Sequence, residues 1–192
     1  MKKSRSTNQG NLTLKGLDFT AVVLTMRDHV LTIILNRPEK KNAINETMVN
    51  EIIYALDYAK QQSDIRVVVI AAAGNVFCAG ADLKAMSGSQ EGQVVSNVPK
   101  RGEFDTLALR LYHLNKPTIA KLQGSVYAGG LMIVTTVTHA IAADNIVFCA
   151  PEILRGLWPF QVMGGLFRVM PQRAGLDFIM RGTKLSAANA AQ

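Results

Sequence analysis

Apolar and polar positions along the chain follow two kinds of pattern. Short runs rich in Val, Ile and Ala are typical of buried strands, and apolar residues that recur every three or four positions are typical of helices that pack on a core. Strands are predicted at 21–26, 30–35, 67–73, 118–122, 141–143 and 146–149. Helices are predicted at 46–62, 83–86, 104–114, 131–137, 162–170 and 176–180, and Ser186 would cap a last short helix.

The alternation of these elements predicts an α/β fold with a mostly parallel sheet. Residues 27–29 are expected to close a hairpin between the first two strands, and Asn45 is expected to cap the first long helix. That helix, 46–62, should be amphipathic because its apolar residues recur at helical spacing. Helix 131–137 is nearly all apolar, which predicts burial on all sides.

The chain has 192 residues, of which 48% are hydrophobic and 18% are charged, a composition that suits one domain with a core. Residues 1–17 are polar and basic, so we expect a disordered tail ahead of a single domain at 18–192. No apolar run reaches the roughly 18 residues that a membrane span needs. Residues 1–17 also lack the apolar centre of a signal peptide. They are acid-poor and rich in Ser, Thr and Asn, as a transit peptide also is, but their apolar face is thin. We therefore expect a cytoplasmic protein with no membrane attachment.

The formal net charge is +7, and much of it lies at the start of the chain, where Lys2, Lys3, Arg5 and Lys15 precede the first acid. A basic tail without interleaved aromatic residues is a weak indication of nucleic-acid binding. We expect no nucleic-acid partner. The alternative, RNA binding through this tail, predicts an affinity that falls as salt is added.

The cysteines and histidines indicate no further chemistry. Cys78 and Cys149 lie far apart beside apolar runs, so both are expected as buried free thiols. His29, His113 and His139 do not have the spacing of metal ligands, so no metal site is predicted.

Two stretches of small residues, 77–84 and 124–130, each follow an apolar run and precede a predicted helix. A strand that ends in small residues and opens a helix leaves backbone N–H groups free. Two such ends side by side would direct two N–H donors at one point. Such a pair of donors stabilises a carbonyl oxygen that becomes negatively charged during a reaction. The alternative is that Gly80 and Gly129 are only turn glycines.

Residues 36–43, 77–86, 116–120 and 151–153 resemble the motifs of the crotonase family, the enoyl-CoA hydratase/isomerase superfamily. They occur in the family's order, from roughly Phe19 to the last residue. The resemblance implies a crotonase-like (ClpP/crotonase) spiral of ββα units that binds acyl-CoA thioesters. Coenzyme A would be part of the substrate, with no permanently bound cofactor, and the protein would be a homo-oligomer, a trimer or hexamer.

The resemblance also implies roles for particular residues. The backbone N–H groups of Ala81 and Gly129 would form an oxyanion hole for the thioester oxygen, and Glu152 would be the acid–base. Desolvation between apolar stretches would raise the pKa of Glu152, although a capping or solvated glutamate is the alternative. The expected contacts of coenzyme A are Arg37, Lys40, Lys41, Ala43, Ala79, Asp82 and Leu83, with an exposed charged loop as the alternative for the basic residues.

The sequence departs from the family's pattern near the second stretch. Met132 stands where hydratases of the family carry a second glutamate, and Ala128 replaces the first glycine of a triplet. One carboxylate suits the movement of a proton between two carbons, so isomerisation of an enoyl-CoA is the favoured reaction. An enoyl-CoA hydratase and a non-catalytic acyl-CoA-binding subunit remain alternatives.

Two further expectations concern the last third of the chain. Trp158, Pro159 and Phe160 fall near the family's acyl pocket, although residues of this kind more often belong to a core. The family continues into further helices beyond residue 192, so the C-terminal helices are expected to be largely missing.

Overall fold

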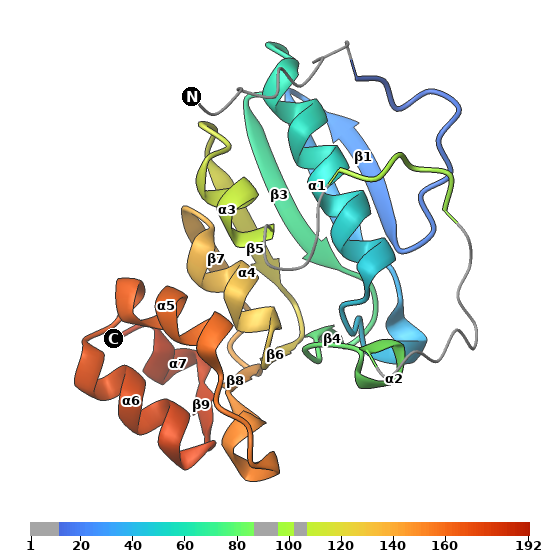
Figure 1. Ribbon diagram of the computed structural model, residues 1–192. Helices are drawn as coiled ribbons and strands as arrows, with labels where there is room; N and C mark the ends of the chain where they lie inside the picture. Colours follow the sequence, from blue (N-terminus) through green and yellow to red (C-terminus); the bar gives the residue numbers. More distant parts are fainter. Residues whose placement is uncertain (1–11, 87–95, 102–106) are drawn as a thin grey trace, which may run out of the picture.

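A computed structural model describes residues 12–86, 96–101 and 107–192 (Figure 1). Within this part the strands form a larger sheet of order β1-β2-β3-β5-β7 and a smaller sheet of order β4-β6-β8-β9. The larger sheet contains β1 Val22–Arg27, β2 Val30–Leu35, β3 Val67–Ala72, β5 Thr118–Leu122 and β7 His139–Ala142. The smaller contains β4 Val76–Cys78, β6 Ser125–Tyr127, β8 Val147–Cys149 and β9 Lys184–Ser186.

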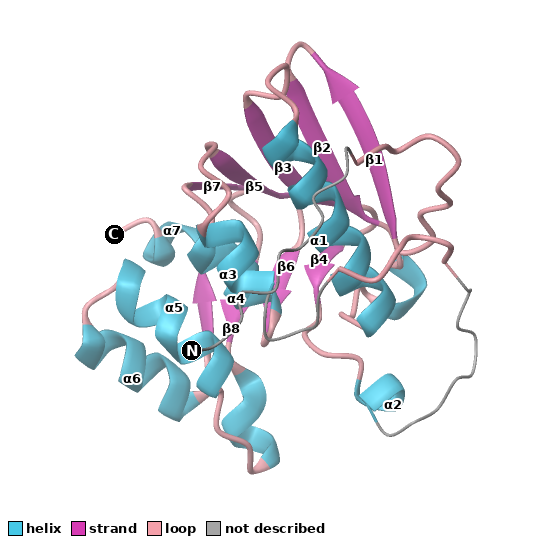
Figure 2. Cartoon of the chain, turned by 45° about the horizontal axis from the view of Figure 1, so that its top comes forward, coloured by secondary structure: helices cyan, strands magenta, loops and turns pink. Residues whose placement is uncertain are grey.

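The helices lie on the faces and at one end of these sheets, and α1 lies against the larger sheet, where it contacts β1 and β2 (Figures 1 and 2). The α-helices are α1 Glu46–Gln61, α2 Leu83–Met86, α3 Leu107–Tyr112, α4 Gly130–Thr136, α5 Phe160–Val169, α6 Gln172–Arg181 and α7 Ala187–Ala190. Short 3₁₀ helices span Pro38–Lys40 and Pro151–Arg155.

Successive passes of the chain place one strand in the larger sheet and then a short strand in the smaller sheet. The successive passes contain β3 and β4, then β5 and β6, then β7 and β8, and a helix or helical turn follows each pass. Strands from different passes pair parallel, while β1–β2 and β8–β9 pair antiparallel. The predicted α/β fold with mostly parallel strands is confirmed, and the order of elements follows a spiral of ββα units.

The first hairpin turns where the sequence predicts. Arg27 pairs with Val30 at the end of β1–β2, so Asp28 and His29 form a two-residue turn. Both have positive φ angles, 48° and 67°. This combination matches the twist of the strands that a hairpin joins.

Helix α1 begins after the predicted cap, since the Asn45 side chain accepts a hydrogen bond from the Met48 amide. Helix α1 has the predicted apolar face, but it is buried beyond that face, because the polar residues Glu51 and Asp57 are buried as well. Residues 96–101 cover the polar side: Asn50 Nδ2 donates to the Val98 and Pro99 carbonyls, and the Arg101 amide donates to Asn50 Oδ1. Polar residues of α1 are therefore buried through specific partners.

Glu51 is the most enclosed of these partners, with a side chain that is fully buried. Its two carboxylate oxygens accept from the amides of Thr20, Ala21 and Val22 at 2.8–3.0 Å, and from the Thr20 hydroxyl at 3.1 Å. These donors lie at the start of β1, an edge strand of the larger sheet. The carboxylate therefore joins the edge of the sheet to α1.

We expect Glu51→Gln to lower the free energy of unfolding by about 2–4 kcal/mol, because an amide group offers one acceptor oxygen where the carboxylate offers two. Chemical denaturation measures the change, and Glu39→Gln, at an exposed position, is the control. Equal stability of both variants would contradict the role given to Glu51.

Some sequence expectations fall short or lie outside the described residues. The three-residue strands β4, β6 and β9 were not predicted, whereas β8, of the same length, follows Ile146 in a longer apolar run. Residues 1–11 of the predicted tail, 1–17, lie outside the described residues. In the described remainder, the Leu12 amide donates to Gln61 Oε1, and the Thr13 carbonyl accepts from the Tyr54 hydroxyl. Residues 104–106, at the start of the predicted helix 104–114, also lie outside the described residues. None of the helices described has the length and apolar character needed to cross a bilayer.

Candidate active site

The smaller sheet contains three neighbouring parallel strands, β4, β6 and β8 (Figure 1). Cys78 pairs with Val126, and Tyr127 pairs with Cys149, so β4, β6 and β8 end at nearly the same level. Ala81, Gly129 and Glu152 each follow one of these ends by two or three residues. Because the carboxyl ends of parallel strands share an edge, residues far apart in sequence meet there.

The amide of Ala81 is left without a partner by the way its neighbours bond. Ala81 forms an isolated parallel bridge with Ile44. The Ile44 amide donates to the Gly80 carbonyl at 2.8 Å, and the Ile44 carbonyl accepts from the Asp82 amide at 2.9 Å. The bridge therefore uses the groups on either side of Ala81. Its own N–H donates to no acceptor among the described residues.

The amide of Gly129 is free for a similar reason. The Ala128 amide donates to the Cys149 carbonyl at 2.9 Å, which holds the end of β6 on β8. The next amides to be used are those of Leu131 and Met132, which donate to the carbonyls of Ala128 and Gly129. Between them, the Gly129 N–H has no protein acceptor within the described part of the chain.

The two small-residue stretches lie in direct contact. A Cβ atom placed on Gly80 would lie 2.6 Å from Ala128 Cβ and 3.4 Å from the Gly129 nitrogen. A Cβ on Gly130 would lie 2.8 Å from Cys78 Cβ. Gly80 also has a φ of +95°, so it is a strained position for any side chain as well as a crowded one. The small residues thus allow the backbones at 80 and 129 to approach each other.

Glu152 lies in the 3₁₀ helix after β8 and is half-buried. Its Oε2 atom is inaccessible to solvent and has no hydrogen-bond partner among the described residues. Burial raises the pKa of Glu152, and its own backbone N–H and the Arg155 charge offset part of that effect. The Glu152 charge in turn adds to the burial that raises the pKa of Cys149. Because burial disfavours its charged form, this carboxyl group holds a proton more readily than an exposed glutamate, as a general acid–base requires.

The residues predicted to hold coenzyme A lie on two adjoining segments. Lys40, Lys41 and Leu83 are exposed, and Ala43 and Ala79 are half-buried. Arg37 differs from the two lysines, because its guanidinium donates to Asp82 Oδ2 at 3.0 Å and to the Ala43 carbonyl. A contact between any of these residues and a nucleotide stays a prediction.

Burial favours a higher pKa for Asp82, but hydrogen bonds from Arg37 and Ala85 and the Arg37 charge outweigh burial and hold its pKa below the ordinary value. The pair with Arg37 therefore persists well into the acid range. Only 14% of each of these two side chains is exposed.

Asn42 is a further residue of this region, and its function was not apparent from the sequence. It is fully buried, with a positive φ of 52°. Its side-chain oxygen accepts from the Arg37 amide, and its Nδ2 donates to the carbonyls of Ala73 and Val76, all at 2.8 Å. An asparagine in a polar loop was the only signal in the sequence, and such residues are usually exposed.

The residues predicted near the acyl pocket differ in how exposed they are. Pro159 is buried, whereas 36% of Trp158 and 73% of Phe160 is exposed. Leu154 and Leu157, on the same side of Glu152 in sequence, are also exposed. This apolar surface follows Glu152 along the chain, and its predicted contact with an acyl group stays a prediction.

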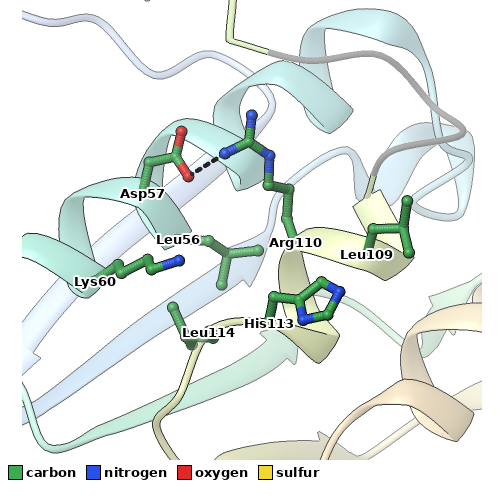
Figure 3. Close-up of a pocket in the computed structure, with 7 residues that line it drawn as sticks. All are labelled: Leu56, Asp57, Lys60, Leu109, Arg110, His113 and Leu114. Atoms are coloured by element: carbon green, nitrogen blue, oxygen red, sulfur yellow. Dashed lines mark hydrogen bonds and ion pairs between the residues drawn. The ribbon is translucent and has the colours of Figure 1, made fainter. Parts of the chain in front are cut away.

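A cavity of about 240 Å³ lies away from the strand ends, between α1 and α3 (Figure 3). Leu56 and Leu114 form its apolar side, and Asp57 is paired with Arg110 at 2.9 Å at one end. Asp57 also pairs with Arg101 at 3.1 Å. Its carboxylate is thus already satisfied, and the cavity contains none of the predicted catalytic residues.

Comparison with known proteins identifies the family. Residues 25–192 match the family model described as enoyl-CoA hydratase/isomerase. The chain belongs to the enoyl-CoA hydratase/isomerase family. It is 33% identical to enoyl-CoA hydratase EchA19 of Mycobacterium tuberculosis over 171 residues, which cover 85% of this chain and 62% of that protein. It is 29% identical over 178 residues to the trans-2-decenoyl-[acyl-carrier-protein] isomerase of Streptococcus mutans, covering 91% of this chain and 67% of that one.

Solved structures of the enoyl-CoA hydratase/isomerase family confirm the predicted crotonase-like fold. A protein from Legionella pneumophila, described as an enoyl-CoA hydratase/isomerase (crotonase), superposes with a TM-score of 0.79 at 28% identity. The match covers 90% of this chain and 67% of that one. The chain therefore spans about two thirds of the length of these relatives.

The contact between Gly80 and Ala128 predicts a non-additive pair of substitutions. We expect Gly80→Ala to lower the free energy of unfolding by about 2 kcal/mol or more, because of its φ and the 2.6 Å approach. Ala128→Gly removes the methyl group that it meets, so the double variant should recover about 1 kcal/mol. Denaturant titration of the four proteins measures this coupling.

Gly164→Ala in α5 is the matched control, because a Cβ there would meet no atom within 4 Å. That variant should be as stable as the wild type or more stable. Purely additive effects at 80 and 128 would show that the two stretches are not in contact.

The raised pKa of Glu152 predicts a pH-dependent stability. Native protein holds this proton more tightly than the unfolded chain, so the stabilisation is fully present below the unfolded pKa and is lost as pH rises through the native pKa. Glu152→Gln removes the titration, so its melting temperature should rise relative to that of the wild type as the pH increases above about 4.3, the ordinary pKa of a glutamate. Glu39→Gln should follow the wild type. Parallel melting profiles of Glu152→Gln and wild type would contradict the burial of this carboxyl group.

Proposed function

We propose that the protein isomerises the double bond of an enoyl-CoA, using Glu152 as its single acid–base group. The observation that carries this proposal is the buried, unpartnered Oε2 of Glu152 at the strand ends where two amides are free. Membership of the enoyl-CoA hydratase/isomerase family supports the substrate class. The relative from Streptococcus mutans is named as an isomerase of an enoyl thioester, which supports the reaction class.

In the proposed reaction, the amides of Ala81 and Gly129 donate to the thioester oxygen of a 3-enoyl-CoA. Glu152 takes a proton from C2, the electrons of that C–H bond move into the thioester, and an extended enolate forms. The same carboxyl group then returns the proton to C4, which gives the 2-enoyl-CoA. Each amide donor of this kind stabilises the developing charge by about 3–4 kcal/mol in systems where it has been removed.

Met132 supports isomerisation over hydration. It is buried in the first turn of α4, 4% exposed, and offers no carboxylate. Addition of water across a double bond needs a group that positions and deprotonates the water as well as one that protonates carbon. One carboxyl group serves proton transfer between two carbons without a second.

Hydration is the second candidate, because EchA19, named as an enoyl-CoA hydratase, is 33% identical to this chain. Binding of acyl-CoA without chemistry is the third, and it would show as affinity without turnover. The predicted homo-oligomer and the cytoplasmic location stay predictions, and sedimentation would test the former.

Purified protein should convert 3-enoyl-CoA to 2-enoyl-CoA faster than it hydrates 2-enoyl-CoA. Glu152→Gln should lower kcat for isomerisation by about 10²–10⁴-fold, the usual contribution of a positioned acid–base. Asp144→Asn, at an exposed turn, is the control and should retain the wild-type rate. Undiminished turnover by Glu152→Gln would remove this residue from the mechanism, and tight binding without turnover by the wild type would favour the binding subunit.

The position of Met132 offers a test of reaction choice. Met132→Glu supplies a second carboxylate and should raise the ratio of hydration to isomerisation, although its burial should lower stability. Met132→Gln, with nearly the same shape and no ionisable group, should leave that ratio low. Equal ratios in both variants and the wild type would show that residue 132 does not choose the reaction.

A further inference from the structure

Two segments that the resemblance assigns to different tasks are joined by a continuous set of hydrogen bonds. Residues 37–44 carry the predicted nucleotide contacts, and residues 76–82 carry the free amide of Ala81. The Ala79 amide donates to the Lys41 carbonyl at 3.0 Å, and the bridge at Ile44 adds two bonds of 2.8 and 2.9 Å. These three backbone bonds hold the second segment along the first.

Asn42 fixes the start of this arrangement. Its Nδ2 group bridges the carbonyls of Ala73 and Val76, which lie on either side of the turn from β3 into β4. Its Oδ1 atom accepts a hydrogen bond from the Arg37 amide. One buried side chain therefore holds the loop against the strand that leads to Ala81.

Arg37 and Asp82 fix the other end. Arg37 Nη2 donates to Asp82 Oδ2, and Nη1 donates to the Ala43 carbonyl, so one guanidinium holds both segments. Asp82 Oδ1 accepts from the Ala85 amide, which also fixes the start of α2. Asp82 follows Ala81 directly, and its amide donates to the Ile44 carbonyl, so this bond and the ion pair restrain the chain just after the Ala81 N–H.

We propose that Asn42 and the Arg37–Asp82 ion pair are positioning residues that hold the Ala81 amide in place for the thioester oxygen. In this account Arg37 acts through Asp82 and Ala81, whereas its sequence-based role was that of a phosphate ligand. The inference rests on the proposed function for its kinetic consequences. Its structural part, the attachment of residues 76–82 to residues 37–44, is independent of any reaction.

The two roles of Arg37 predict opposite effects at its partner. If Arg37 bound phosphate, Asp82→Asn would release the guanidinium and lower KM. If Arg37 positions Ala81, Asp82→Asn removes the charge that holds it, and kcat falls with little change in KM. A displaced donor affects the transition state more than the bound substrate, and a misplacement of about 1 Å can cost about 100-fold in rate.

Kinetics of isomerisation by Asp82→Asn, Arg37→Lys and Asn42→Ala test the proposal. We expect kcat to fall about 10–100-fold in all three, with KM within about threefold of the wild type. Arg37→Lys keeps the positive charge but loses the two-pronged geometry of the guanidinium. Lys40→Ala is the matched comparison, since an exposed lysine on the same loop can affect KM but makes none of the bonds that hold residues 76–82. A lower KM in Asp82→Asn with unchanged kcat would overturn the proposal.

Amide hydrogen exchange tests the structural part without substrate. The amides of Ala79, Ile44 and Asp82 donate across the two segments, so they should lose protection in Asn42→Ala and Arg37→Lys. Amides of the larger sheet, such as Ile33, should retain theirs, which would exclude general unfolding. In Lys40→Ala all of them should remain protected.

The two readouts separate the failure of this inference from the failure of the proposed function. Loss of protection at these amides in a protein with no isomerase activity would overturn the proposed function and leave the attachment established. Retained protection in Asn42→Ala and Arg37→Lys would overturn the attachment, whatever the activity.

Discussion

A strand that ends leaves its last backbone N–H groups without the partners that a longer strand would supply, and an unpaired buried amide is costly. In this chain two half-buried residues at one sheet edge, Ala81 and Gly129, have amides without an acceptor among the described residues. Ile44 bonds to the neighbours of Ala81 and bypasses Ala81 itself, and the first turn of α4 uses the carbonyl of Gly129 but not its amide. The two donors are free because the groups on either side of them bond to other partners. A ligand oxygen that satisfies both would complete the hydrogen bonding of the fold.

Small residues and parallel strand pairing hold these strand ends close together. Gly80 and Gly130 remove the side chains that would separate the stretches, and Ala128 accepts a φ of 49° to turn the chain there. Parallel pairing of β4, β6 and β8 brings Glu152 to the same edge, where burial raises its pKa. Both the free amides and the buried carboxyl group therefore follow from one feature, the common end of three short parallel strands.

Much of this could be predicted from the sequence, and the omissions have a common cause. Runs such as 30–35 and 118–122 predict strands because their neighbouring residues show one consistent local pattern. Asn45 and Ser186 cap helices through hydrogen bonds to residues three positions further along. The burial of Glu51 and Asn42 depends on partners up to 34 residues away, which no local pattern reveals. The same holds for Arg37, whose charge indicates a phosphate ligand until Asp82 is found beside it. Local chemistry was visible in the sequence, whereas the long-range bonds that position it were not.

The central claim is that the amides of Ala81 and Gly129 bind the same thioester oxygen, with Glu152 beside the carbon that loses its proton. A crystal structure with an unreactive acyl-CoA analogue measures this most directly. The account predicts that both nitrogens lie about 2.7–3.2 Å from the thioester oxygen. An oxygen held by only one of these amides, or bound elsewhere on the protein, would contradict it.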